Sequence, residues 1–218
     1  MFKLGDPKSF SSNRRLRFEQ IKLANKRFAQ IKAQRLTQIS AKIDECTKLY
    51  IRGYGNDVEL ISCFRELLFN SRELLDSLIY TIHKKTQEKT RKDFLQFAKK
   101  LMKNEYDNLK LDVISALKTN ITYIFHIRKF RNEIKSNVSN IEFRFVYRSN
   151  TSCFQATFEV PIKRDENELI PFLDIKNKKA AIERNSYRCT ISLDEYFPEM
   201  VAFWTSMFKI TDPSPLSE

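Results

Sequence analysis

Residues 57–85, DVELISCFRELLFNSRELLDSLIYTIHKK, decide the fold class of this chain. The stretch contains no Gly or Pro, and its apolar residues recur every three or four positions, which is the spacing of an amphipathic helix. Those positions are Val58, Ile61, Phe64, Leu68, Leu75, Leu78 and Ile82. Because Asn56 or Asp57 can cap the first turn, we predict one long helix over residues 57–85.

The same spacing appears on both sides of this helix. Residues 12–49 predict a long amphipathic helix that precedes it, and residues 91–104 predict a shorter one that follows it. Residues 107–136 predict another helix, in which the β-branched pair after Asn120 permits a kink. Three to four antiparallel helices make a bundle, which we place in residues 1–138.

After residue 138 the period of the apolar residues changes from helical to alternating. Residues 141–147 and 154–160 each alternate apolar and polar side chains, with Ser149-Asn150-Thr151-Ser152 between them, which predicts a β-hairpin. Weaker candidates follow: strands at 169–175 and 187–193, and a last helix capped by Asp194. The expected fold is therefore mainly α, an antiparallel helical bundle followed by a small α+β segment, residues 139–218, packed on the bundle.

The composition places the chain among ordinary globular proteins with a strong positive charge. Hydrophobic residues make up 42% of the 218 residues, which is enough to build a core. Lys and Arg number 39 against 27 Asp and Glu, giving a net charge of +12. Such a field attracts nucleic acid, acidic proteins or anionic membranes, and does not by itself choose among them.

Several chemistries lack the residues they need. Only three glycines occur, and no G-x-G-x-x-G or G-x-x-x-x-G-K-[ST] motif is present, so we expect no nucleotide cofactor. The four cysteines form no C-x-x-C pair and indicate buried thiols in a reducing compartment. Neither His83 nor His126 has a Cys or acidic residue at metal-ligand spacing, so we expect no metal. Because no secretion signal and no apolar stretch of about 18 residues is present, we expect a cytoplasmic protein that does not enter the membrane.

Positive charge is concentrated at the start of the chain. Residues 1–40 contain ten Lys or Arg and two acidic residues, so eight of the twelve net charges lie there. The candidate nucleic-acid contacts in this helix are Arg14, Arg15, Arg17, Lys22, Lys26 and Arg27. A basic face that only keeps the bundle in solution is the alternative. A membrane-surface helix is less favoured, because the bundle needs the apolar stripe.

Residues 125–137, FHIRKFRNEIKSN, resemble the conserved helix of the HEPN superfamily. In that motif an arginine is followed by a polar residue, often Asn or Asp, and then, further along the helix, by a histidine. Arg131 and Asn132 match the first two positions, and Ser136 stands where the histidine would be. Residues 64–78 are also similar to the first conserved helix of some members.

The resemblance implies a chemistry as well as a helical bundle. Active members bring two subunits together and cleave RNA without a metal: the arginine holds the scissile phosphate, the polar residue orients it, and the histidine transfers a proton at the 2′-hydroxyl. Prokaryotic members often belong to toxin–antitoxin and phage-defence systems. By this resemblance Arg131 and Asn132 are candidate catalytic residues, and a homodimer that acts on RNA is expected.

Proton transfer is the step for which this sequence lacks the family's residue. Ser136 cannot serve as a proton shuttle near neutral pH, and His126 lies about 140° around the helix from Arg131. Both are kept as candidates for that step. The residues that share the polar side of the helix are Arg131, Asn132, Lys135 and Ser136. An anion can bind there, with Arg128 and Lys135 as additional phosphate contacts, whether or not it is cut.

Three functions follow from these residues. The leading one is a regulatory protein that binds RNA or another polyanion through the first helix and the Arg131 region without cutting it. The second is a metal-independent endoribonuclease that uses Arg131 and Asn132, with His126 or a C-terminal residue for proton transfer. The third is a protein–protein interaction subunit, whose hairpin from Phe143 to Val160 recruits a partner through aromatic side chains at its edge.

Overall fold

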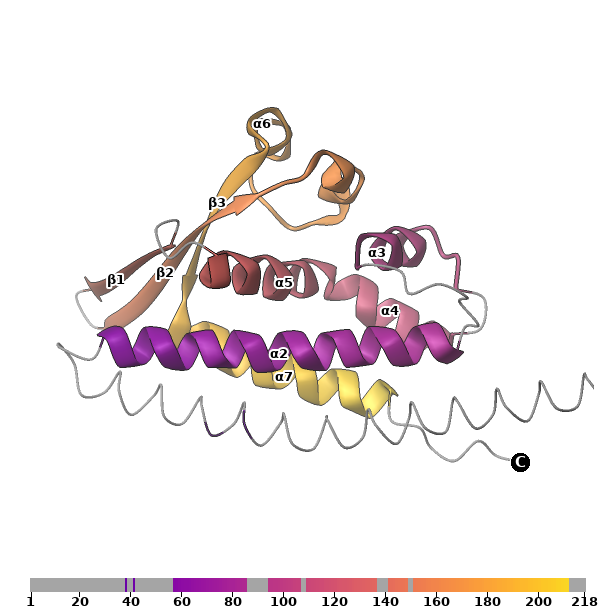
Figure 1. The fold of residues 1–218 in the computed structure, drawn as a ribbon, viewed down its shortest axis with the longest axis horizontal. Helices are drawn as coiled ribbons and strands as arrows, with labels where there is room; N and C mark the ends of the chain where they lie inside the picture. The colour runs from indigo at the N-terminus through magenta and orange to yellow at the C-terminus, as the bar shows by residue number, and fades with distance from the viewer. Residues whose placement is uncertain are drawn as a thin grey trace, which may run out of the picture.

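The computed structural model describes residues 38, 41, 57–85, 94–106, 109–136, 141–148 and 151–211. Within these residues the protein is mainly helical and has a small C-terminal sheet of three antiparallel strands (Figure 1), which confirms the expected fold class. The first predicted helix, residues 12–49, lies outside the described residues except for Gln38 and Ala41, which are helical.

Four helices precede the sheet in the described part of the chain. They are α2 (Asp57–Lys85), α3 (Phe94–Met102), α4 (Leu111–Thr119) and α5 (Ile121–Ser136). Helix α2 has the predicted bounds. The helix predicted over 107–136 is broken rather than kinked, because Asn120 ends α4 with both its backbone N–H and its side-chain amide donating to the Ala116 carbonyl, at 3.2 and 2.8 Å. An Asn side chain that bonds the backbone competes with the helical pattern in this way.

The C-terminal part contains the three strands and three further helices. They are β1 (Ile141–Arg148), β2 (Thr151–Pro161), the 3-10 helix η2 (Arg164–Phe172), α6 (Lys178–Arg184), β3 (Ser186–Ser192) and α7 (Leu193–Thr211). The strand order is β1-β2-β3, with Ile141 opposite Phe158 and Ala156 opposite Ile191. The predicted hairpin, the strand near 187–193 and the last helix are confirmed, whereas α6 was not predicted. The last helix begins at Leu193, so Asp194 lies in its first turn and is not its cap.

The strand predicted at 169–175 is wrong. Most of that stretch belongs to η2, which contains Pro171. Proline has no N–H to give to a strand ladder. The Glu166 carboxylate accepts a hydrogen bond from the backbone N–H of Lys163 at 3.0 Å, so the first turn is closed by its own side chain. Both features favour a helical turn over an extended chain at this point.

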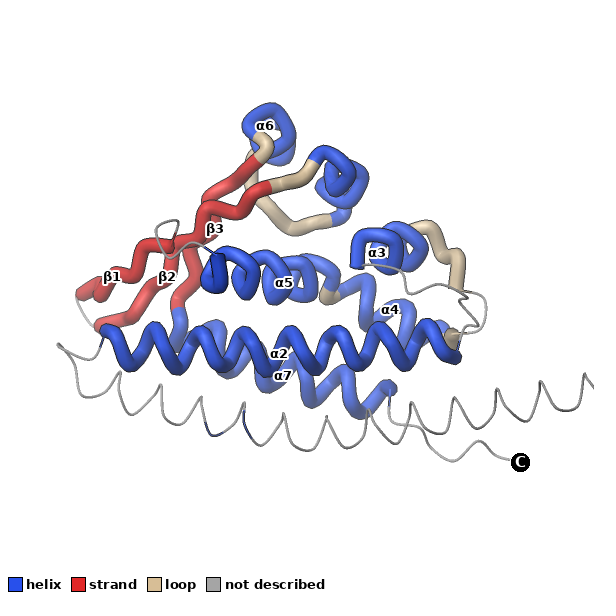
Figure 2. The backbone as a smooth tube through the Cα atoms, viewed as in Figure 1, coloured by secondary structure: helices blue, strands red, loops and turns tan. Residues whose placement is uncertain are grey.

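The long helices and the sheet share one hydrophobic core. Helices α2 and α5 run antiparallel, and the sheet lies across the end of α5 (Figures 1 and 2). The Phe158 ring of β2 stacks on Phe130 of α5 with centroids 4.0 Å apart and meets Phe64 of α2 at 6.1 Å. Tyr196 of α7 meets the same Phe64 ring at 6.0 Å. The expected boundary at residue 138 is not itself described, and the core cluster contains residues from both sides of it.

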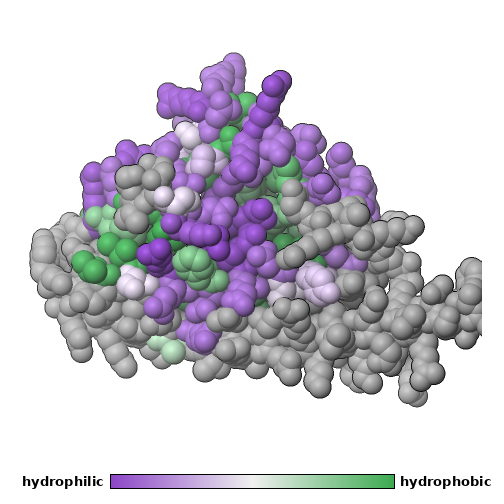
Figure 3. All heavy atoms as spheres, in the orientation of Figure 1, coloured by the Kyte–Doolittle hydropathy of each residue, from purple (hydrophilic) through white to green (hydrophobic). Residues whose placement is uncertain are grey.

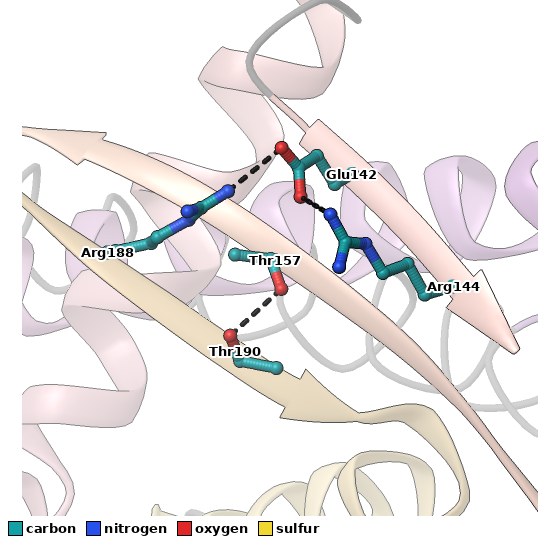
Figure 4. Close-up of polar contacts among 5 residues, drawn as sticks. All are labelled: Glu142, Arg144, Thr157, Arg188 and Thr190. Carbon is teal, nitrogen blue, oxygen red and sulfur yellow. Dashed lines mark hydrogen bonds and ion pairs between the residues drawn. The ribbon is translucent and has the colours of Figure 1, made fainter. Parts of the chain in front are cut away.

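The outer face of the sheet is polar. Glu142 accepts from Arg144 of the same strand at 3.0 Å and from Arg188 of β3 at 2.9 Å (Figure 4). Thr157 and Thr190 pair across β2 and β3 at 2.8 Å. Phe143, expected at an exposed edge, is instead half-buried and meets the Phe64 ring edge-on at 6.4 Å. This aromatic side chain is therefore used by the core.

None of the described helices is both long and apolar enough to span a bilayer.

Candidate anion-binding site

Arg131 and Asn132 lie on the side of α5 that faces α2. The Arg131 guanidinium lies over the Phe69 ring of α2, 4.8 Å from its centroid, and Nη1 donates to Asn132 Oδ1 at 3.2 Å. Its Nε is buried and has no hydrogen-bond acceptor among the described residues. A guanidinium stacked on an aromatic ring keeps its N–H groups in the plane, pointing away from the ring. The structure therefore places the Arg131 guanidinium between the Phe69 ring and the Asn132 side chain.

Arg128 and Arg72 bring two more positive charges to the same place. The Arg128 guanidinium lies over the Phe94 ring of α3, 5.1 Å from its centroid. Arg72 of α2 donates from Nε to Asp76 Oδ2 at 3.0 Å, and its Nη1 is buried with no acceptor among the described residues. We call Arg72, Arg128 and Arg131 the arginine cluster. In the space-filling view, hydrophilic side chains gather over α5 (Figure 3).

The electrostatics of the arginine cluster are unbalanced. Burial lowers the pKa of Arg72, and the positive charges of Arg128 and Arg131 lower it further, while Asp76 opposes them. Arginine keeps its charge near neutral pH even so. In the described part of the chain, Asp76 is the one carboxylate that forms an ion pair with a member of the cluster. Three guanidinium groups around one carboxylate make a site that attracts anions.

Lys135 and Ser136 are exposed in the last turn of α5. The Ser136 hydroxyl donates to the backbone carbonyl of Asn132 one turn earlier. The structure therefore places Arg131, Asn132 and Ser136 on one stretch of helix, as expected, but the Ser136 proton is used by the helix backbone. No side chain in this group is a ready proton acceptor.

His126 lies on the other side of α5, under the sheet. Its Nε2 is 2.7 Å from the Tyr187 hydroxyl of β3, and its ring stacks on Phe130 with centroids 4.9 Å apart. Burial lowers the pKa of His126 to about 4, with Asp174 acting weakly in the opposite direction. At neutral pH the imidazole is uncharged and half-buried. It is not brought together with Arg131.

A buried ion pair lies near His126 and was not anticipated. The Lys129 ammonium is 2.5 Å from Glu166 Oε2 of η2 and 5.4 Å from the centroid of the Phe125 ring. Both partners are nearly fully buried. Because a buried charge is very costly without a partner, this pair ties η2 to α5.

Other candidates lie outside the arginine cluster or outside the described residues. The six basic residues from Arg14 to Arg27 are not described, so their role as nucleic-acid contacts stays a prediction. Among the described residues, no group of three or more His, Cys, Asp or Glu side chains is arranged to hold a metal.

Sequence reasoning missed Arg72, Phe69 and Phe94. The signal for Arg72 was weak: it lies three residues after Phe69 and four before Asp76, which is common on a solvated helix face. It becomes informative only once α2 is known to pack against α5, since that packing brings Arg72 within electrostatic reach of Arg128 and Arg131.

A scan against protein-family models, a search of curated proteins and a search of solved structures each found no match for this chain. The HEPN resemblance therefore stays a hypothesis that rests on the residues of α5.

Proposed function

We propose that this protein binds RNA through the arginine cluster and does not cleave it. One observation carries the proposal: Arg128 and Arg131 lie within electrostatic reach of Arg72, and in the described part of the chain Asp76 is the one carboxylate that forms an ion pair with any of the three. A phosphate placed beside the cluster offsets the repulsion among the three guanidinium groups.

A polymeric ligand fits the charge of the whole chain better than a single small anion does. The net charge is +12, far more than one phosphate neutralises. On this proposal the first predicted helix, with its six candidate basic contacts, follows further phosphates of the same strand. Binding to several phosphates releases several counterions, so the affinity must fall steeply as salt rises.

Cleavage is less well supported than binding. Cleavage of RNA without a metal needs a group that moves a proton beside the scissile phosphate. His126 is half-buried on the other side of α5 and contacts the Tyr187 hydroxyl, and the Ser136 hydroxyl donates to the helix backbone. We therefore assign Arg131 and Asn132 a binding role. A homodimer and a toxin–antitoxin or phage-defence setting are proposed on the resemblance to the HEPN superfamily alone.

The proposal is tested by fluorescence anisotropy with labelled single-stranded RNA in EDTA over a series of salt concentrations. The same samples are then run on a denaturing gel, so that binding and cleavage are read together. Wild type is compared with Arg131→Ala and with a matched control, Arg144→Ala, which removes an arginine that is 71% exposed on the outer face of the sheet.

We expect Arg131→Ala to weaken binding about tenfold to a hundredfold, the value of a hydrogen bond to a charged group, while Arg144→Ala stays near wild type. The RNA should remain intact in every sample. An equal loss of RNA affinity in the two variants would mean that binding depends only on the total charge of the protein. Metal-independent cleavage that Arg131→Ala abolishes would establish the ribonuclease instead.

A further inference from the structure

Next to the arginine cluster the structure contains a cavity of about 310 Å³. It is lined by Gln38, Ala41, Glu66, Phe69 and Asn70. The last three residues belong to α2, and the first two are the helical residues described in the N-terminal part of the chain. This volume lies at the lower end of the range of about 300–1,000 Å³ that small organic ligands occupy.

The cavity and the arginine cluster share a side chain. Phe69 lines the cavity, and the Arg131 guanidinium lies 4.8 Å from the centroid of the same ring. A ligand that enters the cavity against Phe69 therefore has Arg131 beside it. One aromatic ring joins a mainly apolar space to a cluster of positive charges.

We propose that this cavity receives one base of the bound RNA, stacked against Phe69, while the arginine cluster holds the adjacent phosphate. Single-stranded RNA is commonly bound by stacking unpaired bases on aromatic side chains and by hydrogen bonds to the base edges. The cavity is lined mainly by apolar surface, so stacking is the main contact that it offers. The proposal rests on the proposed function and deepens it, since it says which part of the nucleotide is recognised besides the phosphate.

A small part of the cavity lining is polar and can meet the edge of a base. Gln38 and Asn70 carry amides, which both donate and accept hydrogen bonds, and Glu66 carries a carboxylate, which accepts them. Each of these three residues also has an interaction within the protein. A base edge presents donors and acceptors in the same plane and can be met by such groups.

The test compares two ligands with equal numbers of phosphates: a labelled RNA oligonucleotide and an abasic oligonucleotide of the same length. Five proteins are measured by anisotropy: wild type, Arg131→Ala, Phe69→Leu, Ala41→Trp and the control Tyr80→Leu. Ala41 is exposed, so Trp at this position can fill the cavity without entering the core, and it leaves the contact between Phe69 and Arg131 in place. Tyr80 is another aromatic residue of α2 that is 40% exposed and does not line the cavity.

We expect wild type to bind the RNA about fivefold to a hundredfold more tightly than the abasic strand, the range that stacking of one base is worth. Ala41→Trp should abolish this preference while leaving affinity for the abasic strand unchanged. Phe69→Leu should abolish it as well, and Tyr80→Leu should retain it. Circular dichroism identifies a variant that has not folded. If Phe69→Leu does not fold, the result for Ala41→Trp alone tests the base pocket.

Equal affinity of wild type for the two strands, with both weakened by Arg131→Ala, would overturn the base pocket and leave the proposed function standing. A preference that persists in Ala41→Trp and Phe69→Leu would also overturn the pocket. If neither strand binds, the proposed function fails together with the inference.

Discussion

The two sides of α5 hold their ionisable side chains in different ways. On the side towards β3 and η2, His126 has the Tyr187 hydroxyl and Lys129 has the Glu166 carboxylate. On the side towards α2 and α3, Arg128 and Arg131 lie over phenyl rings, and neither has a carboxylate partner among the described residues. We call these the paired side and the arginine side. An ion pair within the protein, such as Lys129 with Glu166, stabilises the fold. An arginine that has no carboxylate partner can instead bind an anionic ligand.

The largest expected effect is a loss of stability, and it concerns the ion pair on the paired side. Replacing Glu166 with Ala leaves the Lys129 ammonium buried without its partner, so we expect the free energy of unfolding to fall by about 3–5 kcal/mol. Urea denaturation followed by circular dichroism measures this. The double variant Lys129→Met/Glu166→Leu should stay close to wild type or exceed it, since it removes both charges. A loss below about 1 kcal/mol in Glu166→Ala would mean that Lys129 reaches water and that the two sides of α5 do not differ.

The second largest expected effect is the change of stability with pH that His126 causes. The pKa of His126 is about 4 in the folded protein and about 6.5 in the unfolded chain. Between these values the unfolded chain binds more protons, so the free energy of unfolding is fully retained above pH 6.5 and falls as the pH drops towards 4. The total loss from this group is about 3 kcal/mol.

Urea denaturation at several pH values checks this expectation, with His126→Gln as the control. The variant should show a shallower loss of stability between pH 6.5 and 4, because the remaining carboxylates titrate in both proteins. Identical pH profiles would show that burial does not lower the pKa of His126.

Two neighbouring residues of α5 give a matched comparison of binding. We expect Arg128→Ala to weaken RNA binding about tenfold, and Lys129→Met to leave the affinity of the folded protein unchanged. The effects on the free energy of unfolding should follow the opposite order. Arg128→Ala loses only the contact with the Phe94 ring, which is worth about 0.5–1 kcal/mol. Lys129→Met leaves the Glu166 carboxylate buried without its partner, which costs more. Anisotropy and urea denaturation on the same preparations measure both quantities. The proposed difference between the two sides of α5 would be wrong if Lys129→Met also binds RNA about tenfold more weakly than wild type.

The smallest effect concerns the carboxylate of the arginine side. Asp76→Asn removes a charge from a residue whose side chain is 49% exposed, so the cost in stability should stay within about 0.2–1 kcal/mol. The same change makes the arginine cluster more positive, and we expect RNA to bind more tightly at low salt. Anisotropy in a salt series checks the direction. Weaker binding would show that Asp76 is needed to orient Arg72 towards the ligand.

Local pattern was enough to predict much of the fold. The bounds of α2 follow from an apolar repeat that continues without interruption from Val58 to Ile82, and the hairpin follows from strict alternation. The pattern failed at 169–175, where the short apolar run around Pro171 has no clear period and a capped 3-10 helix forms instead. Helix α6 has only seven residues, too few for a periodic signal.

The candidate site was predicted only in part, because it is assembled from distant segments. Arg131 and Asn132 could be selected from one stretch of α5. Arg72 could not, since its role depends on the packing of α2 against α5. The ion pair between Lys129 and Glu166 could not be predicted for the same reason. A lysine among other basic residues of a helix is usually solvated. Only the position of η2 makes Lys129 buried.

The shared core has a consequence for how the chain is made. Phe64, near the start of α2, is covered by Phe158 of β2 and by Tyr196 of α7, both of which leave the ribosome much later. Synthesis adds about 5–20 residues per second, so the apolar face of α2 is exposed for several seconds before its partners emerge. During that interval the nascent helices are open to chaperones and to aggregation. A stalled or truncated product that lacks α7 is therefore expected to be a target for quality control.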